Sequence, residues 1–126
     1  MTTWSSTELN KIGAAEELEI ESLRRDGALR KPLTIGVVRV GDNLFVRSYR
    51  GRNGTWFCGA LVRHEGHIQA GGVNKDVAFV KVPELNINDQ IDAAYRTKYR
   101  KHEALYVDPL VAPAARAATI KLVPHD

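Results

Sequence analysis

Short runs of β-type residues separated by tight-turn signals most constrain the fold of this chain. Residues 17–23 alternate between acidic and mainly apolar positions, and residues 33–40 are rich in β-branched side chains. Turn signals follow at Asp26-Gly27 and at residues 41–43, and residues 44–49 make a third run. Such patterns are typical of strands joined by hairpin turns. We expect a three-stranded antiparallel meander, with a helix as the rival interpretation over residues 17–23, because Ala and Glu favour helices.

Three further strand-like runs follow in the second half of the chain. Residues 67–70 and 76–82 flank a Gly71-Gly72 turn, and residues 119–123 form an expected closing strand. Together with the meander they predict six strands. Combined with helical segments between them, this order indicates an α+β fold with an antiparallel sheet, most compatible with a small barrel.

Helical segments are predicted at three places. Ser5 and Glu8 have the spacing of a capping box, which predicts a helix from there to about Ile12, stopped by Gly13. Thr55 is a candidate cap for a short helix over residues 56–62. Trp4, Leu9 and Ile12 are expected to pack the first helix onto the sheet.

The longest helix is predicted over residues 86–102, with Asn86 as its cap. Asp92 and Arg96 stand four residues apart and are expected on its solvent-facing side. The opposite side carries apolar and aromatic residues at helical spacing, namely Ile87, Ile91, Ala94, Tyr95 and Tyr99.

Length and composition limit the class of protein. The 126 residues suit one domain over 1–126, and 44% hydrophobic with 26% charged residues is close to the globular average. No apolar run approaches the ~20 residues of a membrane helix, and no secretory signal is visible, so no membrane partner is expected. The single cysteine, Cys58, cannot form an internal disulfide, which suits a cytoplasmic location.

Positive charge is concentrated in the middle of the chain. The net charge is +3, whereas residues 31–81 alone carry eight basic and three acidic residues, a balance of +5. A basic surface attracts phosphates and other anions. A total of +3 is small for a nucleic-acid-binding protein, so nucleic acid is not the expected partner.

The segment from Arg47 to Thr55 is the best candidate for binding chemistry. A predicted strand ends there, a glycine-bearing basic loop follows, and a helix is expected to begin. Glycine allows close backbone approach, a helix N-terminus favours anions, and Arg47 and Arg50 have the forked donors that grip phosphate. An exposed basic hairpin loop explains the same residues equally well. Trp56 is a candidate for stacking on a flat ring, although such residues are more often core anchors.

The other reactive residues carry weaker signals. The spacing of Cys58, His64 and His67 matches no standard zinc motif, so ordinary surface histidines are the preferred interpretation and no metal is expected. Tyr99 is a candidate proton donor in a pocket. The preferred interpretation of the tyrosines is that they pack the long helix onto the barrel.

Several of these segments resemble known proteins. Residues 43–51, 54–57 and 66–72 resemble the centre of deazaflavin-dependent nitroreductase-like proteins, where a strand ends in a glycine-rich basic loop. Nearly the whole chain also resembles a small bacterial family of unknown function that shares Glu17-Leu18-Glu19-Ile20 and Tyr106-Val107-Asp108-Pro109. That family is similar to the split β-barrels related to pyridoxamine-phosphate oxidase.

The resemblance implies a six-stranded antiparallel split barrel that forms a homodimer and binds FMN or a deazaflavin at the dimer interface. The implied cofactor-binding residues are Arg47, Ser48, Arg50, Gly54, Thr55 and Trp56, and Tyr99 is the candidate catalytic residue. The loop is short and uses arginines where cofactor-binding relatives keep a lysine or a longer loop. The implied function is an oxidoreductase. One alternative is a non-catalytic protein on the same barrel that binds or senses a small molecule. Another is a barrel that binds no cofactor. The third is a weak nucleic-acid binder.

Overall fold

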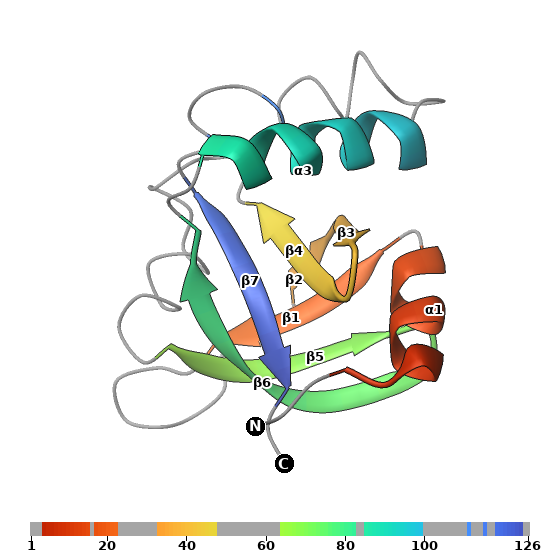
Figure 1. The fold of residues 1–126 in the computed structure, drawn as a ribbon. Helices are drawn as coiled ribbons and strands as arrows, with labels where there is room; N and C mark the ends of the chain where they lie inside the picture. Colours follow the sequence, from red (N-terminus) through yellow and green to blue (C-terminus); the bar gives the residue numbers. More distant parts are fainter. Residues whose placement is uncertain are drawn as a thin grey trace.

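The structure is a computed structural model that describes residues 4–15, 17–22, 33–47, 64–82, 85–99, 111, 115 and 118–124. Within these residues, seven antiparallel strands curl into a nearly closed barrel accompanied by two helices (Figure 1). The expected α+β split barrel is therefore confirmed. The expected helix over 56–62 lies outside the described residues.

The strands follow one another around the sheet in the order β2-β1-β5-β6-β7-β4-β3. Every neighbouring pair is antiparallel. The strands are β1 (Leu18–Ser22), β2 (Leu33–Ile35), β3 (Val37–Val40), β4 (Asn43–Arg47), β5 (Glu65–Ala70), β6 (Val73–Lys81) and β7 (Thr119–Pro124), and the helices are α1 (Ser6–Ala14) and α3 (Leu85–Lys98).

Gly36 divides the single strand that the sequence predicts over residues 33–40. On one side of it β2 pairs with β1, and on the other side β3 pairs with β4. β2 and β3 therefore stand at the two ends of the strand order but are separated by one residue. Because the chain changes its pairing partner at Gly36, the two ends of the sheet come together. The same change explains why the described residues contain seven strands where six are expected.

α1 begins with the capping box that the sequence predicts. The Glu8 amide donates to Ser5 Oγ at 3.1 Å, and the Ser5 amide donates to Glu8 Oε1 at 2.9 Å. The expected stop at Gly13 is wrong, because α1 continues to Ala14. Gly13 instead serves packing, since a Cβ there would lie 3.3 Å from the Arg39 Cβ.

Two apolar clusters hold the helices to the barrel. The larger one fills the barrel and includes Trp4, Leu9 and Ile12, which confirms the predicted docking of the first helix. The smaller one joins α3 to the sheet through five buried residues, Val38, Phe45, Ile91, Tyr95 and Tyr99.

α3 lies across one end of the barrel (Figure 1). It begins at Leu85, so Asn86 lies inside its first turn rather than capping it, and it ends at Lys98 rather than near residue 102. The predicted apolar face is confirmed. Arg96 is exposed as expected, but Asp92 is not on the solvent side: its side chain is 20% exposed and pairs with Arg47.

The β5–β6 hairpin forms where the sequence predicts it. Gly71 and Gly72 make the turn with φ angles of 57° and 86°, a backbone region that glycine adopts readily. β6 begins at Val73, three residues earlier than expected. No helix among the described residues is long and apolar enough to span a membrane.

Candidate functional site

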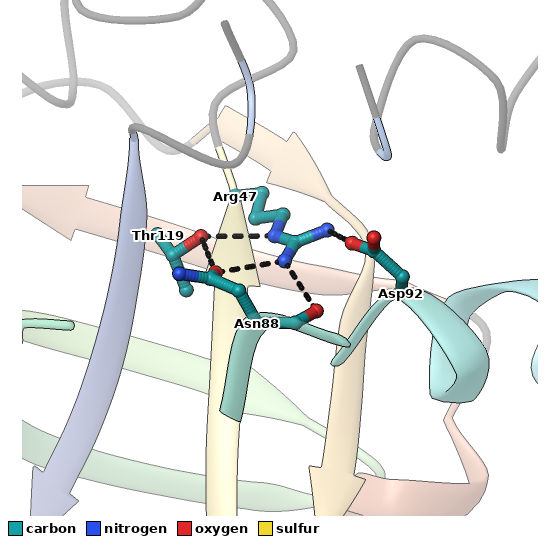
Figure 2. A network of polar contacts seen from close by, with 4 residues as sticks. All are labelled: Arg47, Asn88, Asp92 and Thr119. Carbon is teal, nitrogen blue, oxygen red and sulfur yellow. Dashed lines mark hydrogen bonds and ion pairs between the residues drawn. The ribbon is translucent and has the colours of Figure 1, made fainter. Parts of the chain in front are cut away.

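Arg47 is the last residue of β4, and its side chain is buried beneath α3 with 1% of the residue exposed. Its Nε donates to Thr119 Oγ1 at 2.9 Å (Figure 2). Its Nη2 donates to the backbone carbonyl of Asn88 at 3.1 Å and to Asn88 Oδ1 at 2.9 Å. Its Nη1 forms a short ion pair with Asp92 Oδ1. All three guanidinium nitrogens therefore have partners within the chain.

Three elements bring these four residues together. Arg47 and Thr119 are direct cross-strand partners in the β4–β7 ladder, so their side chains start from adjacent positions. Asn88 and Asp92 are four residues apart on α3, and residues at that spacing share one helix face. Thr119 Oγ1 also donates to Asn88 Oδ1 at 3.1 Å, which ties β7 to the helix directly.

A buried cation needs such a set of partners. Removing a charge from water costs several kcal/mol unless an opposite charge and hydrogen bonds replace the solvent. Asp92 supplies the charge, and Asn88 and Thr119 supply neutral acceptors. The network consequently fixes the first half of α3 to the end of β4, the point from which the chain enters the predicted cofactor segment. A role for Arg47 as a phosphate ligand stays a prediction.

Tyr99 lies at the turn after α3 and is buried, with 6% of the residue exposed. The Val37 amide donates to its hydroxyl at 3.3 Å, and this hydroxyl also lies 3.4 Å from the Val37 carbonyl oxygen. The Tyr95 hydroxyl donates to the Gly36 carbonyl at 3.0 Å. The two tyrosines thus hold α3 against the point where β2 passes into β3, which confirms the packing interpretation. Proton donation by Tyr99 stays a prediction.

Tyr95 lies between the two candidate residues that the structure describes. The Arg47 guanidinium carbon is 5.8 Å from the centre of the Tyr95 ring, and that ring stacks on Tyr99 with centres 6.1 Å apart. Arg47 and Tyr99 are therefore part of one packed layer beneath α3. The other candidates, Ser48, Arg50, Gly54, Thr55 and Trp56, lie outside the described residues.

His67 forms a polar cluster on the β5–β6 hairpin, away from this layer. Its Nδ1 lies 2.9 Å from Asp76 Oδ1 and its Nε2 lies 3.3 Å from Asn74 Oδ1. The hydrogen bond with Asp76 is the main reason that the pKa of His67 is raised. His64 is exposed, as expected for a surface histidine. Cys58 lies outside the described residues, and those that are described contain no group of three or more residues suited to hold a metal ion.

Sequence patterns alone do not single out Asn88, Asp92 and Thr119 as partners of Arg47. Asn88 and Asp92 share the i, i+4 spacing of a helix face, but that spacing alone suits a solvated helix equally well. Their partner Arg47 is 41 and 45 residues away along the chain. Thr119 is the first residue of the predicted closing strand, and no neighbouring residue in the sequence indicates that its hydroxyl has a polar partner.

The barrel with α3 across its end defines this protein as a split β-barrel. The chain belongs to the family described as uncharacterized protein conserved in bacteria (DUF2255), whose sequence profile matches residues 8–122. None of the curated proteins compared with the chain matches its sequence.

Solved structures share the barrel at low sequence identity. HutZ, the heme storage protein from Vibrio cholerae, is 12% identical with a TM-score of 0.71, covering 96% of this chain and 90% of that one. An FAD-binding protein from Mesorhizobium loti is 18% identical with a TM-score of 0.63, covering 98% and 92%. An F420 reductase is 12% identical with a TM-score of 0.58, covering 94% and 93%. The expected resemblance to pyridoxamine-phosphate-oxidase-like and nitroreductase-like split barrels is confirmed at the level of the fold.

Proposed function

We propose that this protein binds a flavin-type cofactor, FMN or a deazaflavin, and uses it as an oxidoreductase acting on a small molecule. The observation that supports this most is the shared barrel. It covers more than nine tenths of both chains in the comparisons with the FAD-binding protein and the F420 reductase. Fold alone does not fix function, so the residues must also suit the cofactor.

The residues that follow β4 in the sequence are of types that suit a cofactor phosphate. Arg50, the hydroxyls of Ser48 and Thr55, and the backbone at Gly54 are the donor types that bind phosphate. Because Arg47 already has partners on all three nitrogens, the phosphate charge is better met by Arg50. In this proposal Arg47 holds the end of β4 in place for the segment that follows.

The bound cofactor would supply hydride or electron transfer. The chain would bind the phosphate through Arg50 and shape the ring pocket with Trp56. Tyr99 would hold a proton on its hydroxyl, which accepts from the Val37 amide in the structure. The packed layer beneath α3 would exclude water from one side of the site.

The proposal includes a homodimer in the cytoplasm with the cofactor at the interface. Leu33 and Val80 are large apolar residues that are 42% and 43% exposed, as expected if a second copy covers part of the barrel. Size-exclusion chromatography with light scattering should give twice the mass of one chain. The mass of one chain at micromolar concentration would contradict the dimer.

A binder or storage protein without catalysis is the second candidate. It is supported by HutZ, a heme storage protein by name, which shares the barrel over 96% of this chain. A titration with hemin followed by its absorbance separates this candidate, since a flavin-dependent oxidoreductase has no need of a saturable heme site.

The primary test is a fluorescence titration of the purified protein with FMN and, separately, with F420. Saturable binding at about micromolar concentration supports the proposal and identifies the cofactor to assay. Arg50→Gln should weaken that binding about tenfold or more, because it removes a charge-assisted contact with phosphate. Arg39→Gln removes an exposed arginine from β3 and serves as the matched control. A folded protein that binds neither cofactor would refute the proposal.

A further inference from the structure

An open groove of about 440 Å³ lies beside β3, between the C-terminal end of α1 and residues 90–98 of α3. Figure 1 shows β3 between α3 and α1, and both helices contact it. The volume is within the range of ~300–1,000 Å³ that small-molecule sites occupy. The groove is separate from the Arg47 network: none of its lining residues belongs to that network.

The floor of the groove is apolar. Val38 and Val40 contribute from β3, and Ala93 and Ala94 contribute from α3. Val38 is buried, Val40 and Ala94 are partly buried, and Ala93 is exposed. Small side chains on the helix leave room above the two valines, so a hydrocarbon or an aromatic ring placed there would lose contact with water.

The groove also has a cation on each side, and none of the described residues that line it is acidic. Arg39 comes from β3 and Lys98 from α3. Lys98 Nζ donates to the Val37 carbonyl at 2.5 Å and lies 5.3 Å from the centre of the Tyr99 ring, which fixes the position of its charge. An arrangement of two cations around an apolar floor favours a ligand that combines an anion with an apolar body.

Arg39 is held in place before any ligand arrives. Its Nε donates to the Gly41 carbonyl at 2.7 Å, and its Nη1 donates to Asn10 Oδ1 at 2.9 Å. Its Nη2 lies 3.8 Å from Asp42, whose side chain is 90% exposed, so that carboxylate is a loose partner. Gly13 permits this placement, since the Arg39 side chain packs directly against the helix there. A fixed guanidinium loses little entropy on binding, and Nη2, whose partner is the loose Asp42 contact, is the nitrogen placed to donate to a ligand carboxylate.

We propose that this groove binds a small carboxylate with an apolar body, as a site separate from the flavin-type cofactor site. The apolar body lies on Val38, Val40 and Ala94, and the carboxylate lies toward Arg39. Because the groove is open, binding is weak, with a Kd of about 1 mM for a ligand of about ten non-hydrogen atoms.

The test uses octanoate as the probe and octanamide as its neutral counterpart, followed by two-dimensional amide NMR of the labelled protein. Octanoate should shift the amides of Val38, Val40 and Ala94 in a saturable way, and octanamide should bind more weakly. Arg39→Gln should weaken octanoate binding about threefold, because an exposed charge contributes modestly. Ala93→Phe should weaken it about tenfold by filling the groove. Lys81→Gln, a matched loss of charge on β6, should change nothing.

Octanoate shifts that map elsewhere, or equal binding of octanoate and octanamide that Arg39→Gln leaves unchanged, would overturn the proposal. Because Arg39 and Ala93 are both surface positions, their variants are expected to fold. The two proposals fail separately: Arg50→Gln should impair FMN or F420 binding and spare octanoate, and Arg39→Gln should do the reverse.

Discussion

Replacing Asp92 by Asn should destabilise the protein by about 2 kcal/mol. The substitution removes the carboxylate that pairs with the Arg47 guanidinium, a buried group in a residue that is 1% exposed. Breaking a buried ion pair by removing one partner costs ~3–5 kcal/mol. We reduce that figure because the Asp92 side chain is 20% exposed and because Asn88 and Thr119 still accept hydrogen bonds from Arg47.

Urea unfolding followed by tryptophan fluorescence measures this loss directly. Glu19→Gln is the matched control, since Glu19 is an exposed acid on β1 and its loss should change stability by less than about 0.5 kcal/mol. In an Arg47→Met background, Asp92→Asn should cost about 0.5 kcal/mol or less, because no buried cation remains to be neutralised. An Asp92→Asn cost equal to the control, or a cost unchanged by Arg47→Met, would refute the reasoning.

Three further predictions concern the barrel. Gly66→Ala should cost about 3 kcal/mol or more, because a Cβ there would lie 2.2 Å from a backbone oxygen of β1 and 2.6 Å from a ring carbon of β6. Gly41→Ala, which faces open space at a φ of 61°, should cost about 1 kcal/mol; equal losses in urea unfolding would contradict this. Trp4→Phe should cost about 1–2 kcal/mol, because it leaves the buried β7 carbonyl without its 2.9 Å hydrogen bond, and an unchanged midpoint would be inconsistent with that contact. The raised pKa of His67 means that its contribution to stability is fully present below its unfolded pKa of about 6.5 and is lost as pH rises through its folded pKa. His67→Gln should abolish that loss, and Asp76→Asn should lower the pKa of His67 measured by NMR; a pKa unaffected by Asp76→Asn would argue against the pair.

Local signals in the sequence predicted most of the barrel. The capping box at Ser5 and Glu8, the β-branched runs and the Gly71-Gly72 turn each depend on neighbouring residues, and each is present in the structure. The division at Gly36 was missed because both halves have the same strand-like composition. Only the change of pairing partner, which is a property of the closed sheet, separates them.

The candidate site was harder to predict because its contacts are long-range. The sequence pattern at Arg47 suggests an exposed phosphate ligand, since an arginine before a glycine-bearing loop is usually accessible. Its burial depends on Thr119, which is 72 residues away, and on an α3 face that helical spacing alone predicts to be solvated. Single-sequence patterns contain no information about which distant polar residues meet.

The position of β7 has a consequence for how the protein is made. β7 is the last of the described strands along the chain, yet it lies between β6 and β4 in the sheet. Until its residues emerge from the ribosome, β6 and β4 each present an unpaired edge, and the described strands can form only two separate sheets, β2-β1-β5-β6 and β4-β3. Exposed edges of this kind invite pairing with other chains. Completion of the barrel must therefore wait until residues 119–124 have left the ribosome, and protection by chaperones is most needed before that moment.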